Sequence, residues 1–190
     1  MNLGESGQIY FKNGYILTMN AVNQVYACGS LLVEGDKILA VGEVDERQLC
    51  RDAEVIDLHG KYLLPGFVNT HVHTSRQISR GVGDDVDFIT WLHKRMWPFE
   101  SSMTEEDSYV STLMCCLEQI RAGVTSFAEP GGQFVSGMAR AVTEAGLRAK
   151  LAKSVMDCGE GLPEIWQRTT EEELEQQIDD LNKYHNTADG

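Results

Sequence analysis

Basic side chains are scarce in this sequence. Sixteen lysines and arginines face 29 aspartates and glutamates, which gives the 190-residue chain a formal net charge of −13. Binding to nucleic acid or to an anionic membrane surface needs a basic face that can neutralise phosphate groups. The charge balance therefore argues against both, and we expect no nucleic acid and no membrane among the partners.

The sequence also lacks long apolar runs and a leader-like beginning. No stretch approaches the ~18 apolar residues of a membrane-spanning helix, and "MNLGESGQIYFK" has no basic patch before an apolar core. The five cysteines are scattered and show no C-x-x-C spacing, which disfavours a disulfide framework and a thiolate zinc knuckle. These absences predict a soluble, cytoplasmic protein whose cysteines pack as small apolar side chains.

Short apolar and β-branched runs predict a string of strands over residues 1–65. In "QIYFKNGYILTM" the Asn13-Gly14 pair favours a hairpin, because it tolerates the positive φ angles of a type I′ turn. A second hairpin is predicted for "LLVEGDKILAVG", and "EVID" and "KYLL" follow as further strands. Pro65-Gly66 cannot continue a regular ladder, so we expect the first domain to end there.

Strand-like and helical patterns alternate over residues 66–190. Strands are predicted at "FVNTHVH", "GVTSFAE" and "RAKLAKSVMD". A helix is expected at "DFITWLHKRMW", ending near Trp97-Pro98 because the residue before proline avoids the α region. This alternation indicates a parallel sheet covered by helices, with about three βα units. A closed (β/α)8 barrel needs ~250 residues, so only part of one can be present.

Three later helices are predicted from their ends and their apolar stripes. The first is capped by Thr104 and is expected to bury a stripe at Tyr109, Leu113, Cys116, Leu117 and Ile120. The second ends at Gly146 and is marked by Val135, Met138, Ala139 and Val142. The third has a capping box from Thr170 to Glu173 and an apolar stripe at Leu174, Ile178 and Leu181.

Two histidines occupy the end of the strand predicted at "FVNTHVH". Side chains alternate along a strand, so His71 and His73 should share one face, with Val72 on the other. Barrels and open α/β sheets bind ligands at the carboxyl ends of their strands. Two neutral imidazoles there could hold one divalent ion, although the H-x-H spacing alone fits a pair of structural histidines equally well.

The passage "LLPGFVNTHVHTSRQISRGVGDD" resembles the first-strand signature of the amidohydrolase superfamily. The resemblance continues through "WLHKRMWPFESSMTEED" and "RAGVTSF" and covers essentially the whole chain. It implies an α/β fold in which a small β-sandwich segment, residues 1–65, precedes a metal-dependent (β/α)8 TIM-like barrel, incomplete over residues 66–190. The most similar subgroup contains the S-adenosylhomocysteine and 5′-methylthioadenosine deaminases, with triazine hydrolases as relatives.

The resemblance also implies roles for particular residues. His71 and His73 match metal ligands for one divalent ion, expected to be zinc, with iron as the alternative. Glu100 matches a carboxylate that accepts hydrogen bonds from ribose hydroxyls. Lys153 stands where several deaminases use arginine to hold the substrate, and lysine lacks the planar pair of donors, which leaves the substrate open. For His59, His93 and His185, ordinary surface or packing roles are expected.

The implied reaction is hydrolytic deamination of an aminopurine derivative by a metal-activated water. A further metal-binding histidine and the proton-transfer residues would come from later strands, so we expect no catalytic residue within this chain and no activity from it alone. The alternatives are a triazine- or guanine-type hydrolase, or a non-catalytic truncated interaction module. The partner is expected to be a small heterocyclic molecule, and a homo-oligomer is left open.

Overall fold

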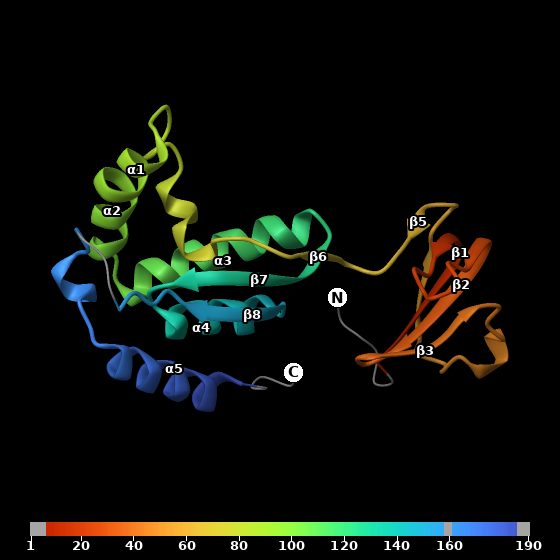
Figure 1. The fold of residues 1–190 in the computed structure, drawn as a ribbon. Helices are drawn as coiled ribbons and strands as arrows, with labels where there is room; N and C mark the ends of the chain where they lie inside the picture. The colour runs from red at the N-terminus through yellow and green to blue at the C-terminus, as the bar shows by residue number, and fades with distance from the viewer. Residues whose placement is uncertain (1–6, 158–160, 186–190) are drawn as a thin grey trace. The chain divides into compact units, whose positions relative to one another are not determined.

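The structure is a computed structural model that describes residues 7–157 and 161–185. The chain divides into two compact units, Met1–Pro65 and Gly66–Gly190, and each is described by itself (Figure 1). Within the described ranges, no helix combines the length and the apolarity needed to cross a membrane.

From residue 7 to Pro65, where the structure describes it, the first unit contains one five-stranded sheet. Its strands are β1 (Gln8–Leu17), β2 (Val25–Glu34), β3 (Lys37–Gly42), β4 (Glu54–Asp57) and β5 (Tyr62–Leu63). The order is β3-β2-β1-β4, and β5 pairs with β1 beyond the stretch that pairs with β4. The hairpin predicted at "LLVEGDKILAVG" is confirmed, since β2 and β3 pair antiparallel across a turn at Gly35 and Asp36. A short 3-10 helix, η1 (Glu46–Gln48), precedes β4.

The hairpin predicted at Asn13-Gly14 is wrong. Asn13 does have a positive φ of 57°, but β1 runs through it without turning. The register with β2 shifts between Phe11 and Gly14, which marks a β-bulge. At this point β1 exchanges one parallel neighbour for another, and Asn13 Nδ2 donates a hydrogen bond to Asp57 Oδ2 at 2.9 Å, where β4 ends.

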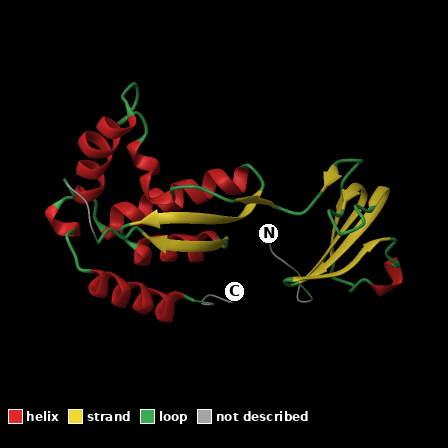
Figure 2. Cartoon of the chain, in the orientation of Figure 1, coloured by secondary structure: helices red, strands yellow, loops and turns green. Residues whose placement is uncertain are grey.

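Among its described residues, 66–157 and 161–185, the second unit contains three parallel strands, each followed by a helix. The strands are β6 (Phe67–Asn69), β7 (Val124–Gly132) and β8 (Arg148–Lys153), in the order β6-β7-β8. The helices are α3 (Glu105–Arg121), α4 (Val135–Ala145) and α5 (Thr170–Tyr184). Figure 2 shows α3 and α4 lying along the sheet. The three predicted βα units are confirmed.

A helical excursion connects β6 to α3. It consists of η2 (Thr74–Ser79), α1 (Phe88–Trp91), the π-helical turn η3 (Leu92–Met96) and α2 (Trp97–Ser102). The expected helix end near Trp97-Pro98 is wrong, because the helical path continues to Ser102. Pro98 lies in the first turn of α2, directly after the π-helical turn, where an irregular hydrogen-bond pattern tolerates its missing N–H. In Figure 1, α1 and α2 stand at the end toward which the β7 arrow points.

Helix α3 buries a face that differs from the predicted one. Thr104 caps it in a capping box with Asp107, as expected, but Leu117 and Ile120 are 56% and 45% exposed. Its buried residues are Ser108, Ser111, Thr112, Cys115, Cys116 and Gln119. This face packs against η2, where Ser111 Oγ donates to the Thr74 carbonyl oxygen at 2.9 Å. The predicted stripe is right at Cys116, which is fully buried, and wrong at Leu117 and Ile120, because polar contacts with η2 also determine which side of α3 faces inward.

Helices α4 and α5 agree with the sequence to different degrees. Gly146 ends α4 in the left-handed conformation, with a φ of 69°, as predicted.

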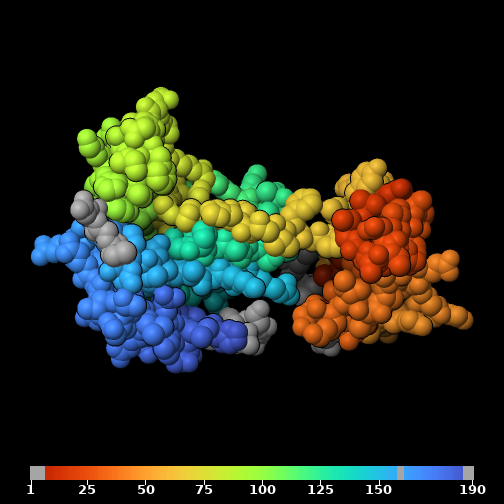
Figure 3. Space-filling model, viewed as in Figure 1, coloured from red at the N-terminus to blue at the C-terminus, as the bar shows by residue number. Residues whose placement is uncertain are grey.

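Helix α5 has its capping box one residue earlier than predicted, from Thr169 to Glu172. Its apolar stripe, Leu174, Ile178 and Leu181, is 58%, 48% and 59% exposed, so these residues do not form a buried face. Ile178 and Leu181 line a groove of about 1120 Å³ that α4 and β8 also border. The space-filling view shows α5 as the lower border of this unit (Figure 3).

A final helical turn, η4 (Glu164–Trp166), lies between β8 and α5. The apolar core of the unit is the cluster of Cys116, Phe127 and Val142 between α3, β7 and α4. Part of the chain directly after β6 also packs against this cluster, and that contact positions the histidines.

Candidate metal centre

His71 and His73 lie just beyond the end of β6. The strand ends at Asn69, shorter than the predicted "FVNTHVH", and the next residues continue without regular secondary structure. Val72 keeps them aligned with the sheet: its N–H donates to the Ala128 carbonyl oxygen at 3.0 Å, and its side chain packs against the core cluster. The rings of the two histidines, on either side of Val72, meet edge to face with centroids 5.2 Å apart and an interplanar angle of 86°.

A buried glutamate from the neighbouring strand holds the second histidine. Glu129 lies on β7 and is only 1% exposed. Its Oε1 is 3.1 Å from His73 Nδ1 and accepts a hydrogen bond from the Gly131 N–H at 3.1 Å. Its Oε2 accepts from Thr74 Oγ1 at 2.8 Å and from the Thr74 N–H. Burial acts to raise the pKa of Glu129, but the hydrogen bonds from His73, Thr74 and Gly131 together lower it below its usual value.

Glu100 approaches the histidine pair through an arginine. Arg76 Nη1 and Glu100 Oε1 form an ion pair at 2.9 Å, with 16% and 12% of the two side chains exposed. Arg76 Nη2 is also 2.5 Å from His73 Nδ1. Burial raises the pKa of the Glu100 carboxyl group, and the positive charge of Arg76 opposes that rise. The structure therefore brings Glu100 close to His73, with the Arg76 guanidinium group between the two side chains.

Lys153 lies at the end of β8, in an ion pair with a glutamate of α5. Its Nζ is 2.5 Å from Glu173 Oε2 on α5, and the two side chains are 12% and 8% exposed. A cavity of about 220 Å³ borders this ion pair, and its lining includes Gln133, Trp166 and Arg168. Gln133 Nε2 is buried and makes no hydrogen bond among the described residues. Lys153 is thus engaged by a carboxylate of its own chain.

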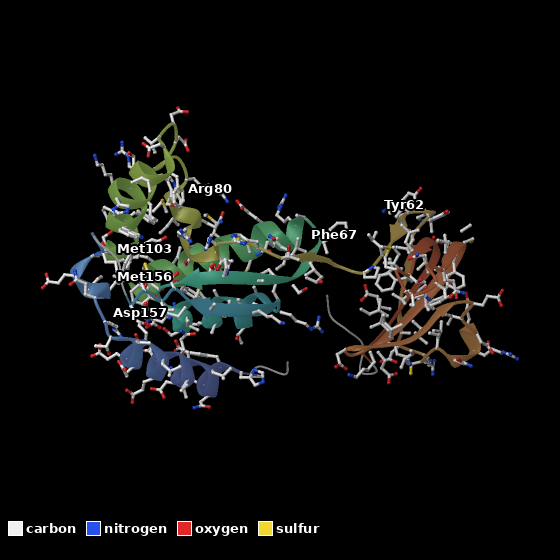
Figure 4. The ribbon with its side chains drawn as sticks, in the orientation of Figure 1. Tyr62, Phe67, Arg80, Met103, Met156 and Asp157 are labelled. Carbon is white, nitrogen blue, oxygen red and sulfur yellow. The ribbon has the colours of Figure 1, made fainter. Side chains whose placement is uncertain are left out.

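Figure 4 locates these parts on the ribbon. Phe67 marks the start of β6, Arg80 follows η2, and Met103 immediately precedes the cap of α3. The three labels bracket the segment that carries the histidine pair, Arg76 and Glu100.

The donor chemistry of the pair fits part of a metal site. Zinc in catalytic sites takes three protein ligands, commonly imidazole nitrogens. His73 Nδ1 already has carboxylate and carbonyl partners, which leaves its other ring nitrogen, Nε2, as the candidate ligand. In residues 7–157 and 161–185 no cluster of three or more histidine, cysteine or acidic side chains could hold a metal. The described residues therefore supply two donors and need others.

Sequence reasoning found the histidines but missed Arg76, Thr74 and Glu129. Of these, Glu129 leaves a trace in the sequence, because it is the acid that ends the strand-like run "GVTSFAE". A charged residue is rarely buried in a central strand unless it has partners. Its partners Thr74 and His73 lie 55 and 56 residues away along the chain, so the sequence could signal the buried charge but not its cause.

Residues 62–189 match the model of the amidohydrolase family. The chain belongs to this family. A 5-methylthioadenosine/S-adenosylhomocysteine deaminase of Bacillus cereus (strain AH820) is 35% identical over 177 residues, which are 92% of this chain and 38% of the relative. The chain thus spans about two fifths of that relative's length.

Solved structures share the fold at lower identity. A triazine hydrolase variant matches with a TM-score of 0.83 at 19% identity, over 95% of this chain and 43% of that one. An adenosine deaminase from Xanthomonas campestris with bound zinc matches with a TM-score of 0.79 at 22% identity, over 94% and 40%. The predicted partial TIM-like barrel of the amidohydrolases is confirmed by these matches together with the family model.

Proposed function

We propose that this chain is part of a metal-dependent hydrolase that deaminates an aminopurine derivative related to S-adenosylhomocysteine or 5′-methylthioadenosine. The observation that carries the proposal is the His71–His73 pair, which meets at the carboxyl end of β6 in an amidohydrolase chain. The 35% identity to a deaminase favours that reaction over others in the family. We also propose that residues 1–65 and 66–190 are its N-terminal β-sandwich segment and its barrel portion.

His71 and His73 are the proposed metal ligands. One divalent ion bound to them and to donors from outside the described residues would activate a water molecule as the nucleophile at neutral pH. Zinc is the expected ion because the Xanthomonas campestris deaminase was solved with zinc, and iron is the alternative. The imidazoles hold the ion, and the β6–β7 contact through Val72 sets their spacing.

Glu100 and Lys153 are the proposed substrate-binding residues. Glu100 would accept hydrogen bonds from ribose hydroxyls, and the positive charge of Arg76 opposes the rise in the Glu100 pKa that burial causes. Lys153 would act on substrate only together with Glu173, because the two side chains are paired in the structure. The cavity of about 220 Å³ beside them offers space for a substrate group.

The direct test measures ammonia release and bound metal together. The 190-residue chain and a version extended through the remaining strands of its relatives are loaded with zinc and given adenosine, methylthioadenosine, guanine and triazine substrates. We expect the extended chain to deaminate an adenosine derivative and the 190-residue chain to be inactive. His71→Asn and His73→Asn should each abolish activity and reduce bound zinc, whereas His59→Asn, a matched histidine of the other unit, should change neither.

Each contrary outcome has a definite meaning. Triazine or guanine turnover without adenosine turnover would replace the proposed substrate class. An extended chain that binds zinc but releases ammonia from no substrate would favour the non-catalytic interaction module. Full zinc binding in His71→Asn and His73→Asn would remove the proposed metal centre.

A further inference from the structure

The environment of Glu129 is a complete set of hydrogen-bond donors around one buried carboxylate. Oε2 takes both donors of Thr74, and Oε1 takes the Gly131 N–H and faces His73 Nδ1. A buried carboxylate is expensive unless it is fully hydrogen-bonded, and an apolar residue would serve β7 better if packing were the only demand. Packing alone therefore does not explain why a carboxylate occupies position 129.

The four contacts of Glu129 are themselves supported from α3. Ser111 Oγ donates to the Thr74 carbonyl oxygen at 2.9 Å, and Thr112 Oγ1 donates to Thr74 Oγ1 at 3.2 Å. Thr74, Ser111 and Thr112 are all fully or almost fully buried. This arrangement explains why α3 turns small polar residues inward, and it fixes the carboxylate of Glu129 with little freedom.

The partners of His73 Nδ1 determine which ring nitrogen carries the proton. Glu129 Oε1 at 3.1 Å and the Gly131 carbonyl oxygen at 3.2 Å can only accept, so together they call for Nδ1–H. Arg76 Nη2 at 2.5 Å can only donate, and it would require an unprotonated Nδ1. Arg76 has an alternative partner in Glu100, whereas Glu129 is fully enclosed and cannot turn away.

We propose that Glu129 is a positioning residue for the metal centre, which accepts the Nδ1–H of His73 and so leaves Nε2 unprotonated and available to a metal ion. The inference rests on the proposed metal role of His73. A carboxylate that holds the second nitrogen of a ligating histidine fixes the orientation of the ring and raises its basicity, and losing such a partner typically weakens metal binding about 10- to 100-fold.

Glu129→Gln is the decisive variant. Every oxygen position of Glu129 faces a donor, so any orientation of a glutamine places its NH2 group against Thr74 or against Gly131 and His73. Glu129→Asp keeps the charge but shortens the reach, and it covers the case in which the glutamine variant does not fold. Glu173→Gln is the matched control, because Glu173 is also a buried carboxylate but pairs with Lys153 instead of a histidine.

The experiment has two readouts. Nitrogen-15 NMR of the imidazoles reports the tautomer of His73 without metal in the 190-residue chain, and cobalt(II) titration of the extended chain reports metal affinity. We expect the Nδ1–H tautomer in the wild type and in Glu173→Gln. In Glu129→Gln we expect a shift toward Nε2–H and cobalt binding weakened about 10- to 100-fold, with Glu129→Asp between the two.

The results separate this inference from the proposed function. If the wild type shows the Nε2–H tautomer, Arg76 is the true partner of Nδ1 and the inference is overturned. If Glu129→Gln or Glu129→Asp is less stable but keeps the wild-type tautomer and cobalt affinity, Glu129 is a structural residue only, and the inference is again overturned. If the extended chain binds no cobalt although His73 has the expected tautomer, the metal role of the pair fails while the hydrogen-bond assignment stands.

Discussion

We expect the ion pair between Lys153 and Glu173 to stabilise the fold, besides the substrate role proposed for Lys153. Their ion pair is mostly buried and joins β8 to α5. Removing one partner of such a pair leaves the other charge poorly solvated. We expect Lys153→Met to lower the free energy of unfolding by about 2 kcal/mol, measured by urea denaturation.

The double variant Lys153→Met/Glu173→Leu provides the control for this prediction. With both charges removed, stability should recover to near the wild-type value, because no lone charge remains buried. Equal stability of Lys153→Met and the wild type would show that the pair contributes nothing, which would leave Lys153 free for substrate.

The described cysteines should differ sharply in reactivity. Cys28 and Cys50 are exposed, whereas Cys115 and Cys116 are buried. Burial raises the pKa of Cys116 to about 12, and it also raises the pKa of Cys115. The thiolate is the reactive form, so at pH 8 iodoacetamide should label Cys28 and Cys50 and spare the adjacent pair, as peptide mapping by mass spectrometry would report. Rapid labelling of Cys116 would mean that α3 separates from the sheet in solution.

For single residues, the sequence predicts which side chains share a face of a strand better than it predicts which residues they contact. The facing of His71 and His73 could be predicted because Val72 between them is apolar and must enter the core. The capture of His73 by Glu129 and of Lys153 by Glu173 could not, since each contact depends on how strands and helices pack after folding.

Helices α3 and α4 pack closely at Gly137. A Cβ atom on Gly137 would lie 2.5 Å from the Glu105 carbonyl oxygen, a backbone atom that cannot move without shifting α3. We expect Gly137→Ala to lower the free energy of unfolding by about 1–3 kcal/mol through overpacking, although alanine is the better helix former. Ser136→Ala, one position earlier on α4, is the control and should be close to neutral in the same denaturation experiment.

Helices α3 and α5 both begin with a threonine capping box, so the contribution of the cap to stability can be compared between them. Thr104→Ala should cost about 1 kcal/mol, because α3 packs in the core. Thr169→Ala should change global stability less, since the apolar stripe of α5 is exposed; its effect should appear as faster amide exchange confined to α5. Equal losses of global stability in both variants would contradict the difference in packing.

The α3 cap also has a predictable pH dependence. The hydrogen bond from Thr104 lowers the pKa of Asp107 in the folded protein. A lowered folded pKa means that the contribution is present above the ordinary aspartate pKa of ~3.9 and is lost as the pH falls through the folded value. The stability gap between the wild type and Thr104→Ala should therefore narrow below pH ~4, and a gap that widens there would contradict the capping role of Asp107.

Elements were predicted well where local chemistry determines them. The Thr104 cap, the left-handed Gly146 and the three βα units follow from short-range rules, and the structure contains them. Asn13-Gly14 failed because a bulge and a tight turn both use a residue with positive φ, and only the partner strands decide between them. The α5 capping box begins one residue earlier than predicted, because two adjacent threonines and three consecutive glutamates fit the capping-box pattern in more than one register.

Over the second unit, apolar residues remain exposed on both outer helices. Leu117 and Ile120 on α3, and Ile178 and Leu181 on α5, are each close to half exposed or more. Apolar periodicity correctly identified the helices but not their buried faces, because burial depends on neighbours that lie beyond each helix. These stripes are the part of the fold that the sequence could not determine.

The exposed stripe of α5 gives the last prediction. Because Ile178 and Leu181 are not buried, Ile178→Lys and Leu181→Lys should each change the free energy of unfolding of the 190-residue chain by no more than about 0.5 kcal/mol. Met138→Ala, in the fully buried interior of α4, should cost about 2–5 kcal/mol. Urea denaturation measures all three. A loss above 2 kcal/mol for Ile178→Lys would mean that the groove between α5, α4 and β8 is closed in solution. The apolar stripe seen in the sequence would then be the buried face of α5.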